Sequence, residues 1–376
     1  MIKIIFFIDS YRVGGMHKQI LYLLENLNKD TFQPIICVSS SKGNLKNEFE
    51  KTNCQTIDLK WKRSYDLSVG FRLVKVLYKE RPDIFMITEP QNFLYYRFAR
   101  LFYLYKIINV GSFRALTFWN GHLSKKHMIL DKFISRLFYK TSDKIIVNSM
   151  AMKMRYEQVI NVSKNKPIQV IYNGCDFNFQ INKSSDSIKK ELNISLGDFV
   201  IIMTARLDPW KDFETILEAI RLVSLEEKNI KLVLVGEGQL RRKITEMISK
   251  KNIQDFVIMA GEKLDIHNYV NMADISVLST NGEGFSNSIL ESMYLEKAVI
   301  ATNVGGNTEL LHVDNKYGIL SDPKSPTHLS KCILILKRDL DLRSKITDSA
   351  KKRIIELCNI KHFISEYENC FKNLVE

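Results

Sequence analysis

At 376 residues the chain exceeds the size at which a single hydrophobic core stops growing, so we expect two domains. Its 45% hydrophobic and 26% charged residues, without low-complexity tracts or internal repeats, exclude a disordered chain and a solenoid. The six cysteines lack metal-ligand spacing, and we interpret them as reduced thiols of a cytoplasmic protein.

The formal charge of +13 is concentrated in the first half of the chain. Residues 1–185 contain 29 Lys and Arg against 14 Asp and Glu, a net charge of +15, whereas the remaining residues have 26 against 28, a net charge of −2. This asymmetry favours attraction to an anionic surface, either nucleic acid or acidic lipid headgroups, although functionless surface lysines are an alternative. The most apolar later stretch, residues 101–110, is far shorter than the roughly 20 residues that cross a bilayer.

Short apolar runs alternate with longer amphipathic ones in the first half. The predicted strands are residues 2–8, 34–39, 84–88, 107–112 and 144–148. The predicted helices are residues 15–27, 67–80, 92–105 and 130–140. Strands that are apolar throughout are typical of a parallel sheet covered by helices on both faces.

A polar stretch at residues 178–190 indicates a domain boundary, and the alternation then begins again. The second set of predicted strands is residues 199–204, 231–236, 256–261, 275–279 and 298–302. The second set of predicted helices is residues 213–226, 240–249 and 286–296. We therefore expect two Rossmann-like α/β domains in tandem, with ligands beyond the carboxyl ends of the strands.

Several strand-end loops carry residues suited to a phosphate. Gly14 and Gly15 follow the first strand and open a helix, where backbone N–H groups can approach a phosphate, although a simple tight turn fits about as well. Arg206 and Lys211 follow the first strand of the second domain, and two such cations can clamp a diphosphate. Asp212 is the expected N-cap of the next helix.

Two carboxylates flank a further strand-to-helix turn. Glu283 lies in the loop after a predicted strand, and Glu291 lies in the second turn of the following helix. Ser286 or Asn287 is the expected N-cap, which directs the positive end of the helix dipole toward an anion. Carboxylates are poor phosphate ligands but accept hydrogen bonds from sugar hydroxyls, so the loop suits a group that is part phosphate and part sugar.

These residues resemble the retaining glycosyltransferases of family 4, which have the GT-B fold of two facing Rossmann-like domains and an interdomain cleft. The resemblance is carried by Glu283-Gly-Phe-Ser-Asn-Ser-Ile-Leu-Glu291, which is similar to the family's Glu-x7-Glu motif, and by Arg206 with Lys211. Supporting segments are residues 172–176, 235–240, 273–275 and 299–309, in the family's order. The implied domains are residues 1–180 for the acceptor, residues 181–358 for the nucleotide sugar, and a helix at 359–376 that crosses back to the first domain.

The resemblance also implies roles for individual residues. Glu283 would contact the transferred sugar and Glu291 the ribose, while Arg206 and Lys211 would hold the diphosphate. Further substrate contacts are implied for a larger set of residues: Gly14, Gly15, Phe285, Ser286, Asn287, Asn173, and Glu262 with Lys263 near the base. Because the cations and the helix N-terminus can stabilise the departing nucleoside diphosphate, we expect no cofactor and no metal. The pair Asp339 and Asp341 is interpreted as a solvated helix surface.

One position departs from the family, which often has a His facing the transferred sugar. Arg114 stands there in this chain, and His122 follows eight residues later. Arg114 is expected to bind an anionic sugar, to bind an acceptor phosphate, or to be a surface or helix-capping residue without a ligand.

The activity implied is transfer of a hexosyl or N-acetylhexosaminyl group from a nucleotide diphosphate sugar, with UDP as the expected nucleotide. Residues 95–106, 61–65 and 123–127 mix aromatic and basic side chains in the basic half, although core packing explains most of the aromatics equally well. We therefore expect a bacterial cytoplasmic enzyme, peripheral on the inner membrane face, that glycosylates a lipid-linked acceptor in surface polysaccharide or glycolipid synthesis. The alternatives are a sugar-nucleotide epimerase of the same fold and a soluble transferase with a small acceptor. A nucleic-acid-binding module is disfavoured, because the strand-end residues of the second domain would then lack a purpose.

Overall fold

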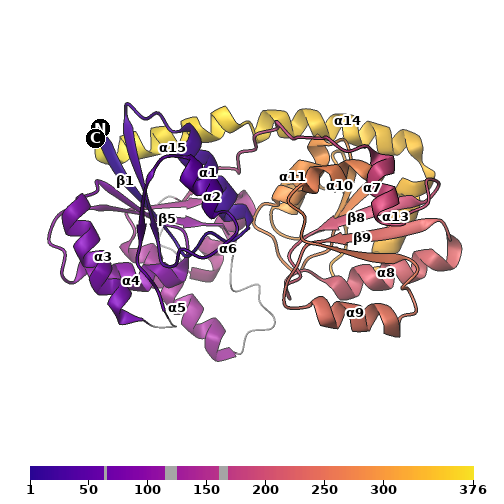
Figure 1. The fold of residues 1–376 in the computed structure, drawn as a ribbon, viewed down its shortest axis with the longest axis horizontal. Helices are drawn as coiled ribbons and strands as arrows, with labels where there is room; N and C mark the ends of the chain where they lie inside the picture. Colours follow the sequence, from indigo (N-terminus) through magenta and orange to yellow (C-terminus); the bar gives the residue numbers. More distant parts are fainter. Residues whose placement is uncertain (63–65, 115–124, 161–167) are drawn as a thin grey trace. The chain divides into compact units, whose positions relative to one another are not determined.

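The computed structural model describes residues 1–62, 66–114, 125–160 and 168–376. The chain forms two compact units, which are considered separately (Figure 1). Unit 1 contains the described residues from Met1 to Gly174 together with Ile360–Glu376, and unit 2 contains Cys175–Asn359. Unit 1 is therefore built from two stretches of chain that the whole of unit 2 separates in sequence.

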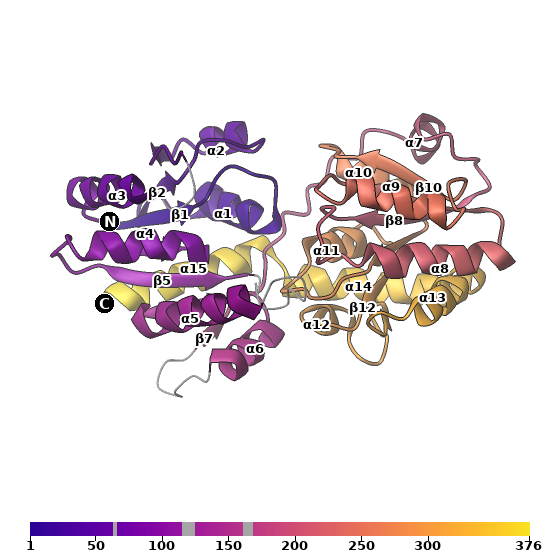
Figure 2. The ribbon, with the colours of Figure 1, turned by 90° about the horizontal axis from the view of Figure 1, so that it is seen from below.

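Unit 1 is organised around a seven-stranded sheet in the order β3-β2-β1-β4-β5-β6-β7, in which neighbouring strands are parallel. Its strands are β1 (Ile2–Ile8), β2 (Phe32–Val38), β3 (Gln55–Asp58), β4 (Ile84–Ile87), β5 (Ile108–Phe113), β6 (Lys144–Val147) and β7 (Ile168–Val170). Its helices are α1 (Gly15–Asn26), α2 (Lys46–Lys51), α3 (Leu67–Glu80), α4 (Pro90–Arg100), α5 (Lys125–Thr141), α6 (Met150–Ile160) and α15 (Ile360–Val375). Figures 1 and 2 show α1 and α15 on one face of the sheet and α3, α4 and α5 on the other.

Helix α15 completes the core on the α1 face of unit 1. Phe371 is fully buried, and its ring centroid lies 6.3 Å from that of Phe6 on β1 and 6.2 Å from that of Phe32 on β2. Phe363 and Tyr367 are buried in the same cluster. The last helix of the chain is thus a structural part of the unit that the first residues form.

Unit 2 is organised around a six-stranded parallel sheet in the order β10-β9-β8-β11-β12-β13. Its strands are β8 (Phe199–Thr204), β9 (Ile230–Val235), β10 (Val257–Gly261), β11 (Ile275–Leu278), β12 (Ala298–Thr302) and β13 (Ile319–Ser321). Its helices are α7 (Ser185–Glu191), α8 (Phe213–Glu226), α9 (Arg241–Lys250), α10 (Ile266–Met272), α11 (Asn287–Tyr294), α12 (Asn307–Leu311), α13 (Pro326–Arg338) and α14 (Leu340–Leu357).

The α/β architecture with parallel sheets confirms the predicted fold class, but one predicted helix is wrong over its last turn. The helix expected to run to residue 105 ends at Arg100, where Arg100 Nη1 donates hydrogen bonds to the carbonyl oxygens of Tyr103 and Tyr105, each at 2.9 Å. These bonds hold residues 101–105 in a turn that leaves the helix. Among the described residues, no helix is both long enough and apolar enough to cross a membrane.

Candidate active site

The predicted donor residues of unit 2 converge on one point of its sheet. Strands β8 and β11 are neighbours, and the chain continues from β8 toward β9 and β10 on one side and from β11 toward β12 and β13 on the other. This reversal of strand order is the topological switch point, where the loops that leave the carboxyl ends of the two strands diverge. Arg206 and Lys211 belong to the loop after β8, and Glu283 belongs to the loop after β11.

Two glycines of the next strand-end loop allow that loop to pack closely against the loop after β8. A Cβ added to Gly236 would lie 2.0 Å from the carbonyl oxygen of Ala205, and both Gly236 and Gly238 have positive φ values. Glycine is therefore required for the backbones to approach this closely. Arg206 extends from the supported loop with its side chain 55% exposed, and its Nη2 lies 2.7 Å from Oδ2 of Asp208. Asp212 caps α8 by accepting a hydrogen bond from the Thr215 N–H, as predicted.

Lys211 and Glu283 form an ion pair across the switch point. Lys211 Nζ lies 2.5 Å from Glu283 Oε2, and both side chains are largely buried. The Glu283 carbonyl oxygen accepts a hydrogen bond from the Gly306 N–H at 3.1 Å, which ties this loop to the loop after β12. Lys211, which is expected to hold the diphosphate, is thus in contact with Glu283, which is expected to contact the transferred sugar.

Helix α11 begins at the predicted place and presents its N-terminus to the same loops. Ser286 is the N-cap, and its Oγ accepts a hydrogen bond from the Ile289 N–H at 3.4 Å. The positive end of the α11 dipole therefore lies beside the Lys211–Glu283 pair. Phe285 is buried, and Asn287 is the first helical residue. Glu291 lies in the second turn, where it is buried with its Oε2 3.9 Å from Nε2 of His267.

The two residues expected near the base lie at the edge of the sheet. Glu262 and Lys263 follow β10, which is separated from β8 by β9. Glu262 is exposed, but Lys263 donates to Glu191 Oε1 at 3.0 Å and its Nζ lies 4.8 Å from the centroid of the Tyr269 ring. Lys263 is therefore engaged by the protein itself.

The remaining predicted site residues belong to unit 1. Gly14 is the extended N-cap of α1, and Gly15 is its first residue. Arg114 follows β5, where its Nη1 donates to Asn173 Oδ1 at 2.7 Å and its Nη2 donates to Tyr367 OH at 2.6 Å. Arg114 thus links the end of β5 to α15. His122 lies outside the described residues.

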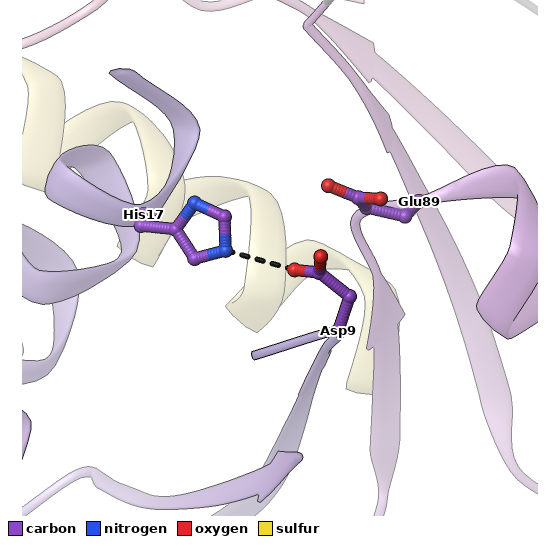
Figure 3. A group of neighbouring side chains, drawn as sticks. All are labelled: Asp9, His17 and Glu89. Atoms are coloured by element: carbon purple, nitrogen blue, oxygen red, sulfur yellow. Dashed lines mark hydrogen bonds and ion pairs between the residues drawn. The ribbon is translucent and has the colours of Figure 1, made fainter. Parts of the chain in front are cut away.

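A cluster of titratable side chains in unit 1 was not predicted from the sequence: Asp9, Arg12, His17 and Glu89 (Figure 3 shows all but Arg12). Asp9 directly follows β1 and Glu89 follows β4, so the strand-end rule applied to the second domain could have found both. Burial acts to raise the pKa of Asp9, but the hydrogen bond from His17 and the charge of Arg12 outweigh it and lower that pKa. Burial raises the pKa of Glu89, and the charge of Asp9 raises it further.

Among the described residues, one group of side chains could hold a metal ion. That group is Asp9, His17 and Glu89 of unit 1. Asp339 is instead the N-cap of α14, where its Oδ1 accepts a hydrogen bond from the Leu342 N–H, and Asp341 lies exposed in the first turn. The unit 2 site therefore offers cations, a helix N-terminus and carboxylates for a ligand that carries both phosphates and hydroxyls.

Two family models match nearly the whole chain between them. The model described as "Glycosyltransferase Family 4" matches residues 13–179, and the one described as "Glycosyl transferases group 1" matches residues 184–353. The chain belongs to the group 1, family 4 glycosyltransferases of GT-B fold. It is accordingly an enzyme of the glycosyltransferase class.

Named relatives span most of the chain at low identity. The N-acetyl-alpha-D-glucosaminyl L-malate synthase of Bacillus anthracis is 24% identical over 315 residues, which cover 83% of this chain and 80% of that protein. The GalNAc-alpha-(1->4)-GalNAc-alpha-(1->3)-diNAcBac-PP-undecaprenol alpha-1,4-N-acetyl-D-galactosaminyltransferase of Campylobacter jejuni is 24% identical, with 98% of this chain and 100% of that protein covered.

Solved structures have the same fold. HepE from Anabaena, crystallised in complex with UDP and glucose, superposes with a TM-score of 0.84 at 18% identity over 99% of this chain and 100% of that one. The sucrose-phosphate synthase from Thermosynechococcus elongatus gives a TM-score of 0.83 at 16% identity over 100% and 99% of the two chains. At this level of identity the similarity establishes the GT-B fold alone.

Proposed function

We propose that the protein is a retaining glycosyltransferase that moves a hexosyl or N-acetylhexosaminyl group from a UDP-sugar to a lipid-linked glycan. The observation that carries the proposal is the unit 2 switch point, where Arg206, Lys211, Glu283 and the N-terminus of α11 come from the loops after two adjacent strands. The choice of UDP is supported by the HepE complexes, which contain UDP. The lipid-linked acceptor is supported by two relatives named for undecaprenol-linked substrates.

The donor chemistry follows from the charges at this site. Departure of the nucleoside diphosphate builds negative charge on the phosphates, and Arg206, Lys211 and the positive end of the α11 dipole stabilise that charge. Glu283 accepts hydrogen bonds from hydroxyls of the transferred sugar, and Glu291 accepts them from the ribose. In this mechanism the transfer needs no metal, so its rate is expected to be unchanged by EDTA.

A panel of nucleotide sugars tests the donor. We expect one UDP-sugar to release free UDP slowly in the absence of acceptor, and the product formed with acceptor to keep the anomeric configuration of the donor in its NMR spectrum. Epimerisation of the donor without release of UDP would instead support the epimerase alternative. Neither binding nor release for any donor would refute the transferase proposal.

Site variants with matched controls distinguish an effect on catalysis from an effect on folding. Glu283→Gln and Arg206→Ala are each expected to abolish turnover without lowering the thermal stability appreciably. Glu218→Gln is the control for Glu283, because Glu218 forms an ion pair of the same length, 2.5 Å, with Lys251. Arg338→Ala is the control for Arg206, since Arg338 is 54% exposed and also paired with carboxylates. Equal losses in a site variant and its control would reject the assigned roles.

An exposed aromatic surface on unit 1 supports the proposal of a lipid-linked acceptor. Helix α3 and the turn after α4 expose a group that we call the aromatic patch: Phe71, Tyr78, Leu101, Phe102, Leu104 and Tyr105. The ring centroids of Phe71 and Phe102 lie 5.9 Å apart, as do those of Tyr78 and Tyr105. Tyr78 OH also donates to the Phe102 carbonyl oxygen at 2.8 Å, so the helix and the turn form one surface.

The patch is bordered by exposed cations: Lys75, Lys79, Arg81 and Lys106. The Arg81 guanidinium carbon lies 4.8 Å from the centroid of the Tyr105 ring. Aromatic side chains between basic residues suit the interface of an anionic leaflet, where the rings enter the headgroup region and the cations bind lipid phosphates. We therefore propose that unit 1 docks on the cytoplasmic face of the cell membrane, in a cell-surface polysaccharide or glycolipid pathway.

Vesicle co-sedimentation tests this surface. Binding to vesicles with acidic lipids is expected, with loss at high salt and on neutral vesicles. Leu104→Asp should reduce binding severalfold, because Leu104 is 86% exposed within the patch, whereas Leu264→Asp in unit 2, at an 88% exposed leucine, should not. Equal binding by both variants would reject the patch and favour a small soluble acceptor.

A further inference from the structure

Unit 1 has a switch point of its own, formed by its own strands. Strands β1 and β4 are neighbours, with β2 and β3 on one side and β5, β6 and β7 on the other. Asp9 follows β1 directly, Glu89 lies two residues beyond β4, and His17 lies in the first turn of α1. Three elements that are distant in sequence therefore place two carboxylates and an imidazole at the general ligand position of this sheet.

The three side chains point toward one another. His17 is 2% exposed, and its Nε2 lies 2.9 Å from Oδ1 of Asp9. One ligand atom from each of Asp9, His17 and Glu89 can be chosen so that all three lie within 4.8 Å of one another. Figure 3 shows the His17 ring directed at Asp9, with the Glu89 carboxylate turned toward the same space. The imidazole is buried, and the Asp9 and Glu89 side chains are 22% and 18% exposed.

A cation already bridges the two carboxylates. Arg12 Nε lies 3.2 Å from Asp9 Oδ2, and Arg12 Nη2 lies 2.6 Å from Glu89 Oε1. The Arg12 side chain is 48% exposed. The cluster sets two carboxyl groups and an imidazole against one guanidinium. The cluster therefore favours a cation and disfavours an anion.

We propose that Asp9, His17 and Glu89 bind one divalent transition-metal ion, which displaces the guanidinium of Arg12. A neutral imidazole nitrogen with two carboxylate oxygens is a ligand set that zinc accepts in proteins, with bonds of about 2.0–2.2 Å. Ligand atoms around such an ion are roughly 3.4 Å apart, so rotation of the two accessible carboxylates toward the fixed imidazole completes the geometry. Three protein ligands leave a coordination position for water or for an oxygen of a bound molecule.

Zinc titration of the full-length protein tests the site. The protein is stripped with EDTA and desalted, and Zn²⁺ is then titrated in competition with a chromophoric chelator. A Cys54→Ser background removes the cysteine that is not buried. We expect one equivalent of Zn²⁺ to bind, and Asp9→Asn and His17→Gln each to weaken binding by more than about 10-fold, the smallest effect usual for residues that support a metal site.

Arg12→Gln supplies a test that misfolding cannot mimic, because it should tighten zinc binding severalfold by removing the competing cation. His328→Gln is the control, since His328 Nδ1 lies 2.8 Å from an Asp322 carboxylate oxygen in an exposed pair of unit 2. Three results would each overturn the proposal: an unchanged Zn²⁺ affinity in Asp9→Asn, weaker Zn²⁺ binding in Arg12→Gln, or loss of the bound Zn²⁺ ion in His328→Gln. The measurement detects metal alone, so its result does not depend on the transferase activity.

Discussion

Gly306 determines how closely the loops of the donor site approach each other. A Cβ added at Gly306 would lie 1.9 Å from the carbonyl oxygen of Gly284, which is next to Glu283. The φ of Gly306 is −66°, a value open to every residue, so the close approach and not the backbone conformation demands glycine. The position of Glu283 therefore depends on Gly306, in the loop after β12, having no side chain.

We expect Gly306→Ala to lower the free energy of unfolding by about 1–3 kcal/mol, the usual cost of overpacking, and to weaken UDP binding because the 283–285 backbone must move. Urea unfolding and a UDP thermal-shift titration measure the two effects. Gly197→Ala is the control, because an added Cβ there meets no atom within 4 Å. If Gly306→Ala matched Gly197→Ala in both measurements, the loop would not be held by this contact.

At the residue scale the sequence was most informative where a chemical motif coincided with a strand end. Lys211, Glu283 and Ser286 could be placed at one site because both neighbouring strands were recognisable as apolar runs. The ion pair between Lys211 and Glu283 could not be predicted, since it depends on how far each loop extends from the sheet. The partners of Arg114 could not be predicted either, because Asn173 and Tyr367 are 59 and 253 residues away.

At the element scale, the capping of α11 positions the phosphate end of the proposed donor site. The Ser286 hydroxyl oxygen accepts from the Ile289 N–H, and the Ser184 hydroxyl oxygen caps α7 in the same way. Ser286→Ala and Ser184→Ala should each cost about 1 kcal/mol of stability in chemical denaturation. Only Ser286→Ala should also weaken UDP binding. If both variants changed the UDP affinity to a similar extent, the Ser286 cap would have no specific role in the donor site.

Helix α15 can be tested as a part of unit 1. Phe371 is fully buried between the rings of Phe6 and Phe32, so Phe371→Ala should lower stability by about 3–5 kcal/mol through the cavity that it leaves. The loss should appear in the unfolding of unit 1, followed by hydrogen exchange in β1 and β2. Val375→Ala, at a residue that is 41% exposed on the same helix, should change little. Protection that fell only in unit 2 would contradict this packing.

Long elements with a regular apolar pattern were predicted well, and short elements at sheet edges were not. Strands β1, β8 and β12 and helices α3 and α8 have the predicted bounds, because their burial requires unbroken or periodic apolar residues. Strand β3 has the sequence Gln-Thr-Ile-Asp and lies at the edge of its sheet. Its residues are exposed or only partly buried, so its sequence has no apolar run that would mark a strand. Strands β7 and β13 have three residues each, which is too short for a period to be recognised.

At the scale of the whole molecule, the acid stability of unit 2 depends on carboxylates that tie α7 to the loop after β10. A hydrogen bond from Tyr269 and the charge of Lys263 lower the pKa of Glu191, and a hydrogen bond from Lys183 lowers that of Asp265. Carboxyl groups with lowered pKa values in the folded state stabilise it above their unfolded pKa values of about 4, and this contribution is lost as the pH falls through the folded values.

We therefore expect Glu191→Gln to lower the midpoint of thermal unfolding at pH 7. The difference from the unmodified protein should shrink as the pH falls below about 4 and vanish once the pH is below the lowered pKa of Glu191. Differential scanning calorimetry across this pH range measures the difference. Glu214→Gln, at an exposed position in the first turn of α8, is the control. A deficit that persisted unchanged at low pH would show that Glu191 acts through packing and not through its charge.

The placement of α15 has a consequence for how the protein is made. The core of unit 1 needs Phe363, Tyr367 and Phe371, yet these residues are synthesised only after the whole of unit 2. Until α15 is synthesised, the nascent chain carries an apolar face on β1, β2 and α1 that α15 covers in the described fold. Unit 2, which is continuous in sequence, can fold while synthesis continues. The half of the enzyme that is synthesised first is therefore the half that is completed last, and a ribosome that stalls before residue 360 releases a chain with an uncovered core.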